Sequence, residues 1–418
     1  MKRFYLLTLL AALVFSGCDK DESSSTESDK LTSMFDPAFA RILQEKGYVS
    51  DAENITPDDM EHIAAITELD VSGSYSNPGA LTSLRGIEHF ESLTALFCSF
   101  NQLTSLDVSR NSKLTDLDCD DNRLTTLDVS HNPELTYLSC YSNQLTSLDV
   151  SHNPELASLA CSSNQLTSLD VSRNSKLTDL DCDDNRLTTL DVSHNPELYY
   201  LSCYSNQLTA LDVSQNPGLM ILICHSNQLT SLDVSRNPIL DDLSCYSNQL
   251  RTLDVSQNPE LMNLSCSSNQ LTTLDVSRNS KLADLSCYSN QLATLDVSQN
   301  LELMNLSCSS NPLTTLDVSG CMKLMYLTCD DNQLASLDVS QNPELTYLFC
   351  SSNQLTTLDV SICTKLMFLS CDSNPGDGVS TFPITAWFDN DTKPTGLNVS
   401  EEWVYEDKTI HVDFQKAE

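Results

Sequence analysis

The 418-residue sequence predicts a repeat solenoid with a parallel β front sheet. Cysteine recurs every 21 residues, from Cys98 to Cys371, and an asparagine follows each of these cysteines by three residues. Between them lies a Leu-x-x-Leu-Asp-Val-Ser segment, first at Leu103 to Ser109. A period repeated fourteen times indicates stacked units, because no single unit of this length can bury its apolar face alone.

Each unit divides into two halves. The first half predicts a front strand, since side chains alternate along a strand. In Leu138-Ser139-Cys140, leucine and cysteine would point inward and serine outward. The second half, with its own Leu-x-x-Leu, is predicted to be extended, with short strands on the back face. The halves have 10 and 11 residues, so we expect faces of similar width and a gently bent, twisted rod rather than a tight horseshoe.

The N-terminus predicts a sorting signal. A basic start at Met1-Lys2-Arg3 precedes an apolar run over Phe4 to Phe15 and then Ser16-Gly17-Cys18. This pattern resembles a bacterial lipobox, which implies diacylation of Cys18 and cleavage before it; an ordinary secretory signal with a chance cysteine is the alternative. Lys20-Asp21-Glu22 resembles the surface-export signal of Bacteroidetes lipoproteins. We therefore expect a lipid-anchored outer-membrane protein exposed at the cell surface, with no other membrane contact.

The rest of the chain predicts caps around one array. The expected segments are a signal peptide at 1–17, a disordered tether at 18–33, a helical N-terminal cap at 34–66, the array at 67–374 and a β cap at 375–418. In the first cap, Asp36-Pro37 and Thr56-Pro57 have the residues typical of helix starts. We predict a first strand at 67–72, later strands at 383–387 and 403–414, and a hairpin turn at 406–408.

The cysteine column is predicted to be a packing feature. Neighbouring cysteines would lie one strand apart, about 4.8 Å, and point the same way, which does not suit a disulfide or converging metal ligands. Cys321 and Cys363 replace the second asparagine of their repeats and lie two turns apart, too far to bond.

Composition and motifs exclude several functions. The net charge of −36 argues against nucleic-acid binding, which needs a basic surface. The sequence contains no G-x-S-x-G or H-E-x-x-H motif and no phosphate-binding loop. We therefore expect no enzymatic activity and no cofactor.

The outward positions of the front strands form the expected binding surface. They are rich in Tyr, Ser, Asn and Asp, as protein-recognition surfaces are. The repeat around Ile221, Ile223 and His225 departs most from the pattern, which suggests either a contact hot spot or drift within a redundant repeat. The candidate ligand-binding residues are Tyr137, Tyr141, Tyr200, Tyr204, Ile221, Ile223, His225, Tyr246, Tyr288, Tyr326 and Tyr347. Phe349 and Phe368 are assigned to contacts with the C-terminal cap.

Acidic residues raise the question of metal binding. Asp116, Asp118, Asp120 and Asp121 form a cluster that recurs 63 residues later, because 103–135 and 166–198 are identical. One duplication explains both copies, so we interpret the clusters as solvated acidic patches, with calcium as the alternative, and predict no metal site. A column of aspartates from Asp107 to Asp359 on the back face predicts mutual repulsion of about 1 kcal/mol per neighbouring pair, and hence a stability that depends on salt or divalent cations.

These repeats resemble the cysteine-ladder branch of the internalin-type leucine-rich repeat family, as in Leu135-Thr-Tyr-Leu-Ser-Cys-Tyr-Ser-Asn-Gln-Leu-Thr-Ser-Leu-Asp-Val-Ser-His-Asn153. The resemblance covers about 66–374 and implies surface-displayed adhesion or protein binding, without specifying a ligand. We expect a monomer that binds an extracellular protein, from a host or a bacterium, through its front sheet. Glycan binding and a purely structural role as an envelope spacer are the alternatives.

Overall fold

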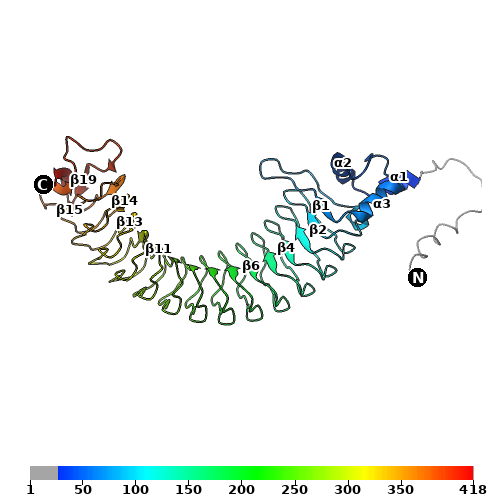
Figure 1. Cartoon of the computed structure of the whole chain (residues 1–418), viewed down its shortest axis with the longest axis horizontal. Helices are drawn as coiled ribbons and strands as arrows, with labels where there is room; N and C mark the ends of the chain where they lie inside the picture. Colours follow the sequence, from blue (N-terminus) through cyan, green and yellow to red (C-terminus); the bar gives the residue numbers. More distant parts are fainter. Residues whose placement is uncertain (1–26, 418) are drawn as a thin grey trace, which may run out of the picture.

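The computed structural model describes residues 27–417, so the predicted signal peptide and Cys18 lie outside the described residues. The described chain forms one curved array with a small cap at each end (Figure 1). Three helices, α1 (Glu27–Thr32), α2 (Pro37–Glu45) and α3 (Pro57–Ala65), form most of the N-terminal cap. None of the described helices is long and apolar enough to cross a membrane.

The two predicted cap helices are present, and their starts follow the expected physical chemistry. Asp36 accepts hydrogen bonds from the amides of Ala38 and Phe39, at 2.8 and 3.2 Å, at the start of α2. Thr56 and Asp59 form a reciprocal capping box at the start of α3. A proline in the first turn costs no hydrogen bond, because the amides there have no partner within the helix.

The end of the predicted tether is folded. Residues 27–32 form α1, and Leu31 packs against the core. Ser28 Oγ donates to the carbonyl of Ile55 at 2.8 Å, and the Ile55 amide donates to Thr32 Oγ1 at 2.9 Å. The prediction of a disordered tether is therefore wrong for 27–33, because these residues satisfy polar groups of the cap that a polar composition alone does not reveal.

The front sheet is parallel and contains sixteen strands in the order β1 to β14, β16 and β18. Each array strand pairs with the residue 21 positions later, as in Leu117 with Leu138. The front strands are β1 (Glu68–Asp70), β2 (Ala95–Phe97), β3 (Asp116–Asp118), β4 (Tyr137–Ser139), β5 (Ser158–Ala160), β6 (Asp179–Asp181), β7 (Tyr200–Ser202), β8 (Ile221–Ile223), β9 (Asp242–Ser244), β10 (Asn263–Ser265), β11 (Asp284–Ser286), β12 (Asn305–Ser307), β13 (Tyr326–Thr328), β14 (Tyr347–Phe349), β16 (Phe368–Ser370) and β18 (Asn398–Val399). A short 3-10 helix, η1 (Ile87–His89), precedes β2. The predicted solenoid and its register are confirmed.

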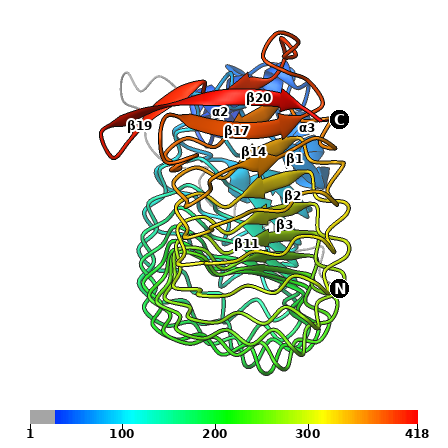
Figure 2. The ribbon, with the colours of Figure 1, turned by 90° about the vertical axis from the view of Figure 1, so that its left-hand side faces the viewer.

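The C-terminal cap covers the last turn with a second sheet, in the order β15-β17-β20-β19. Its strands are β15 (Leu358–Asp359), β17 (Thr381–Ala386), β19 (Glu402–Tyr405) and β20 (Lys408–Lys416), and Figure 2 shows the last three lying across the end of the array. Glu406 and Asp407 have positive φ values, so the hairpin turn lies where the sequence places it. Trp403 Nε1 donates to the carbonyl of Asn374 at 2.9 Å and ties the cap to the final repeat.

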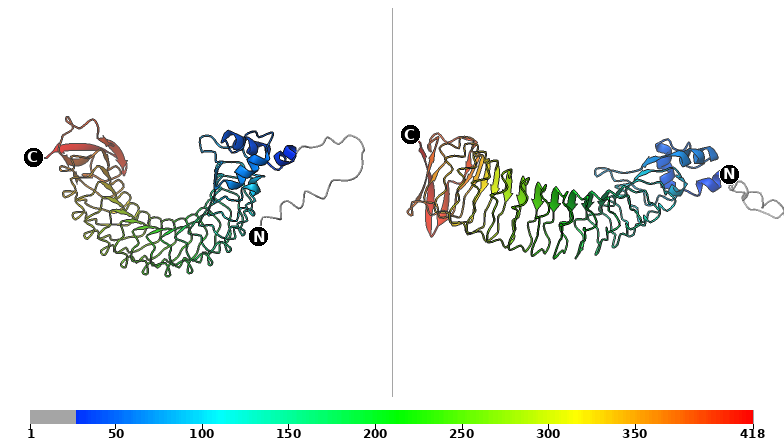
Figure 3. Two further views of the ribbon diagram at one scale, coloured as in Figure 1. Left: turned by 45° about the vertical axis from the view of Figure 1, so that its right-hand side comes forward. Right: turned by 60° about the horizontal axis from the view of Figure 1, so that its bottom comes forward.

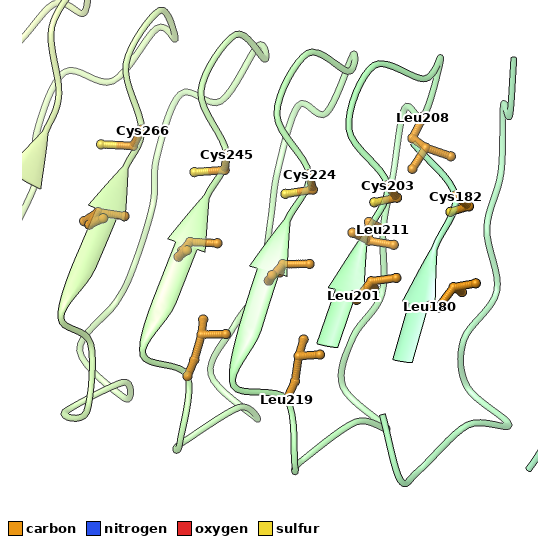
Figure 4. Close-up of a cluster of buried hydrophobic side chains, with 14 of the residues drawn as sticks. Leu180, Cys182, Leu201, Cys203, Leu208, Leu211, Leu219, Cys224, Cys245 and Cys266 are labelled. Carbon is orange, nitrogen blue, oxygen red and sulfur yellow. The ribbon is translucent and has the colours of Figure 1, made fainter. Parts of the chain in front are cut away.

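Leucine and cysteine side chains fill the interior. Figure 4 shows the sulfur atoms of successive strands in register and pointing the same way, beside the inner leucines. All fourteen ladder cysteines, together with Cys321 and Cys363, are buried free thiols. Cys321 Sγ lies 3.7 Å from the carbonyl oxygen of Val297, where neighbouring repeats place an asparagine amide.

Two asparagine columns link the turns. Asn122 donates to the carbonyls of Cys98 and Cys119 at 3.0 and 3.1 Å, and its Oδ1 accepts from the Leu103 amide at 2.9 Å. On the opposite side, Asn132 donates to the carbonyls of Val108 and Asn111 at 3.0 and 2.9 Å. These side chains satisfy buried backbone groups that the short strands leave unpaired.

The array is strongly curved, with the front sheet on the concave side, and it coils along its length (Figures 1 and 3). The prediction of a gently bent rod is wrong. Backbone bridges on the back face link only the residues 107, 128 and 149 near one end and 296, 317, 338 and 359 near the other, within the described chain. Front strands are held at about 4.8 Å by their hydrogen bonds. The central back segments lack this constraint, so they can spread and the sheet curves inward, although the two halves have similar lengths.

The aspartate column on the back face is stabilised within each repeat. Asp107 Oδ1 accepts from the Ser109 amide at 3.0 Å, and the equivalent pair recurs in every repeat to Asp359 and Ser361. The serine side chain and amide lower the pKa of Asp128 and of most other aspartates in the column. Each carboxylate therefore stays charged and solvated, so these bonds offset part of the predicted repulsion and the charges still face one another.

We predict that the melting temperature at pH 7 rises when NaCl is increased from about 20 mM to about 0.5 M, because salt screens repulsion between exposed carboxylates. Since folding lowers these pKa values, their contribution is present above the unfolded pKa of about 3.9 and is lost as pH falls through the lower folded values. Thermal scans across salt and pH, with and without millimolar calcium, measure both effects. A melting temperature indifferent to ionic strength and calcium at pH 7 would refute the repulsion.

Candidate binding surface

The outward side chains of the front strands form three columns on the concave face. The first column precedes the inner leucine, as at Tyr200 and Ile221; the second lies between leucine and cysteine, as at Ile223; the third follows the cysteine, as at Tyr204 and His225. Two residues after each ladder cysteine, the backbone adopts a positive φ, from Phe100 to Ser373. This turn ends each front strand in the same way, so equivalent side chains of all repeats are held in register.

The third column contains an aromatic stack at the middle of the array. The rings of Tyr204 and His225 lie 4.5 Å apart at 14°, and those of His225 and Tyr246 lie 4.0 Å apart at 12°. Tyr246 Oη also lies 3.1 Å from His225 Nε2. We call these three residues the central stack. Burial lowers the pKa of His225 and raises that of Tyr204 to about 12, so the stack is uncharged at neutral pH.

The other candidate residues are spread over the same face. Tyr200 and Ile221 are paired in the first column, and Ile223 lies beside Ser202 and Ser244 in the second. Tyr141 and Tyr288 are 41% and 39% exposed in the third column, the latter separated from the central stack by Ser267. Tyr137 lies on β4, near the N-terminal end of the array. The curved sheet therefore presents all of these residues on one face without bringing them into a single cluster.

The C-terminal turns carry a second aromatic group. The rings of Tyr326 and Tyr347 are 5.5 Å apart, and Phe349 lies 5.7 Å from Tyr326 and 4.8 Å from Phe368. The assignment of Phe349 to the cap is therefore wrong, because its ring packs on the front face; Phe368 lies beside the cap strand β18 but also joins this group. The sequence analysis also missed the methionines beside them, Met262, Met304, Met325 and Met367, which recur at multiples of 21 and are 39–54% exposed.

The two acidic clusters are built into the front face. Ser139 Oγ donates to Asp120 at 2.6 Å, and the Tyr141 amide donates to the same carboxylate at 2.7 Å. In the duplicated copy, Asp183 accepts from the hydroxyl of Ser202 and from the Tyr204 amide, each at 2.8 Å. Among residues 27–417, no three His, Cys, Asp or Glu side chains are arranged to hold a metal ion.

Burial changes the titration of these carboxyls. It raises the pKa of Asp120 to about 6. It raises the pKa of Asp183 further, together with a hydrogen bond and repulsion from Asp181. Because the folded pKa lies above the unfolded value, the contribution of Asp183 to stability is complete below about pH 3.9 and is lost as pH rises through the folded pKa.

We therefore predict that Asp183→Asn raises the melting temperature relative to the wild type at alkaline pH and leaves it equal or lower at about pH 4. Asparagine can still accept from the Tyr204 amide and can donate to Asp181. Thermal scans from acid to alkaline pH provide the measurement. Asp184→Asn is the matched control, because Asp184 is exposed and makes the same change of charge. Parallel pH profiles for the wild type and Asp183→Asn would contradict the prediction.

Together, the 21-residue repeat, the buried cysteine column and the concave parallel sheet define a leucine-rich repeat solenoid with a cysteine ladder. The functional domain of InlJ from Listeria monocytogenes, which includes a cysteine ladder, is 35% identical, with a TM-score of 0.74 over 85% of this chain and 92% of that domain. A leucine-rich repeat protein of Leptospira interrogans is 26% identical, with a TM-score of 0.63 over 76% of this chain and 93% of that one. No protein-family model and no curated protein sequence matches the chain. The chain belongs to the internalin-type leucine-rich repeat family.

Proposed function

We propose that this chain is a binding protein that holds an extracellular protein on its concave front sheet. The central stack carries the proposal. Three uncharged rings in contact provide a rigid apolar surface in mid-array, and rigid aromatic residues surrounded by small polar ones are the usual anchors of protein recognition. Membership of the internalin-type family supports a role in binding, and the proposal involves no chemistry on the partner.

The geometry of the stack favours a protein over a glycan. Both faces of the His225 ring are covered, by Tyr204 and Tyr246. The stack therefore presents mainly ring edges, while a sugar packs its C–H groups on an open aromatic face. Ring edges and tyrosine hydroxyls suit the mixed apolar and hydrogen-bonding contacts of a protein surface.

The test uses serine substitutions that the array itself tolerates, because serine occupies the third column at Ser162, Ser267 and Ser309. A variant with Tyr204→Ser, His225→Ser and Tyr246→Ser should keep its fold and bind an extracellular protein at least about tenfold more weakly than the wild type. Tyr75→Ser, in the N-terminal insertion, is the matched control and should bind as the wild type does.

The assay exposes immobilised chain to extracellular proteins and, separately, to a glycan array. Retention of a protein by the wild type and the control, with loss in the triple variant, supports the proposal. Binding of glycans alone would support the alternative of a glycan-binding protein. Equal protein binding by all three chains would place the site elsewhere, and no binding to either probe would favour a structural spacer.

We also propose that Cys18 is lipidated and that the chain is displayed at the outer surface of the outer membrane, on the basis of the lipobox-like residues 16–18 and the acidic signal after them. Labelled palmitate should be incorporated into the wild type and not into Cys18→Ser. Proteinase added to intact cells should degrade the chain. Protection from proteinase, with a labelled anchor, would instead indicate the periplasmic leaflet.

A further inference from the structure

An apolar patch covers the C-terminal turns of the concave face and the edge where the front strands begin. We call it the C-terminal patch, and it consists of Met304, Met325, Tyr326, Tyr347, Phe349 and Met367. The three methionines are 39%, 46% and 54% exposed, and both tyrosines are 37% exposed. The inner leucines of the same turns are buried, so these residues are not needed to fill the core.

The composition of the patch indicates a docking surface. Contiguous apolar patches are uncommon on soluble monomers and mark sites of interaction. The aromatic rings contact one another, so they are rigid, whereas methionine adapts its shape to an apolar partner. A partner would therefore contribute aliphatic or aromatic side chains at this place.

The charge around the patch specifies the rest of the partner. None of the outward positions in the three front columns carries Lys or Arg, whereas ten carry Asp: Asp116, Asp118, Asp120, Asp179, Asp181, Asp183, Asp242, Asp284, Asp330 and Asp372. The lysines of the last turns lie away from the columns and pair with glutamates, Lys323 with Glu302 and Lys365 with Glu344.

The acidic residues beside the patch lack a cationic counterpart. Asp330 lies between two turns of the patch, and burial, together with repulsion from Asp331 and Asp372, raises its pKa. Burial and the charges of Asp241 and Asp284 raise the pKa of Asp242 in the same way. A lysine or arginine from a partner would stabilise the charged form of these carboxylates.

We propose that the C-terminal patch docks a cationic amphipathic segment of a partner protein, with apolar side chains on the methionines and rings and with Lys or Arg opposite Asp284, Asp330 and Asp372. The proposal rests on the proposed function of the concave face and assigns a place and a chemistry to it. A second copy of the chain does not fit, because its net charge of −36 would bring like charges together.

The test uses a library of random peptides displayed on phage and selected on the full chain. Peptides that combine Lys or Arg with Leu, Phe, Trp or Met should be enriched. An apolar variant with Met304→Thr, Met325→Thr, Tyr326→Asn and Tyr347→Asn uses residues that the array has in the same columns, at Thr136 and Asn263. It should bind an enriched synthetic peptide at least about tenfold more weakly than the wild type.

A charge variant with Asp284→Asn, Asp330→Asn and Asp372→Asn should also weaken binding and should flatten its dependence on salt. Tyr137→Asn with Tyr141→Ser, at the other end of the face, is the control and should change neither. Thermal unfolding checks that all variants fold.

Three outcomes would overturn the inference: enrichment of acidic or uncharged peptides, unchanged affinity in the apolar and charge variants, or self-association of the chain through this patch in sedimentation experiments. Peptides that ignore the C-terminal patch and depend on the central stack would refute this inference and leave the proposed function standing. Selection of no peptide that depends on any front-face variant would refute both.

Discussion

Replacing Asn227 with alanine is expected to lower the free energy of unfolding of the central repeats by about 3 kcal/mol, because it leaves several buried backbone groups unpaired at once. Asn227 Nδ2 donates to the carbonyl of Cys203 at 3.0 Å and to that of Cys224 at 3.2 Å, and Oδ1 accepts from the Leu208 amide at 3.0 Å. Alanine can replace none of these bonds, and the site is too well packed to admit water easily.

Denaturant unfolding and hydrogen exchange provide the measurement. The Leu208 amide should exchange faster in Asn227→Ala, and the effect should fall off over neighbouring turns, because each repeat contacts only its neighbours. Gln228→Ala is the matched control, since Gln228 is exposed and adjacent in sequence. A loss below about 1 kcal/mol, comparable to a surface substitution, would show that the asparagine column does not hold the turns together.

The cysteine ladder is expected to change from unreactive to fully reactive on unfolding. Burial raises the pKa of Cys119 and Cys224 well above the usual thiol value, as it does along the whole column. Since the thiolate is the reactive form, native thiols should react with a disulfide reagent only when the array opens. In denaturant without reductant, at least the fourteen ladder thiols should titrate.

Rapid native reaction of several thiols would mean that the column is accessible. A denatured count well below fourteen would mean that neighbouring cysteines are bridged. Denatured chain treated first with reductant gives the full count and serves as the control. This measurement separates a packing column from a disulfide framework without a structure.

Much of the fold could be predicted from the sequence because the repeat itself imposes it. The exact spacing from Cys98 to Cys371 determines the register of every front strand, and Asp36 and Thr56 mark the starts of the cap helices through local hydrogen bonds. Curvature could not be predicted in the same way. It depends on how far the back segments spread, and that depends on backbone bridges rather than on the number of residues in each half.

The binding surface was predictable as columns but not as clusters. Periodicity places Tyr204, His225 and Tyr246 in one column, whereas their stacking depends on side-chain conformations that no spacing encodes. Phe349 was assigned to the cap because it lies near the end of the array, but its outward position on β14 directs it to the front face. The exposed methionines were visible at multiples of 21, and comparing every column would have revealed them.

The central claim is that the concave sheet is the protein-binding face. It is tested most directly with a photoreactive benzoylphenylalanine placed at Tyr246 in one chain and at Thr273 in another. Thr273 is exposed and belongs to the segments of the back face. After irradiation in a mixture of extracellular proteins, we predict covalent protein adducts with the Tyr246 chain and none above background with the Thr273 chain. Adducts from Thr273 alone, or in equal amounts from both positions, would contradict the claim.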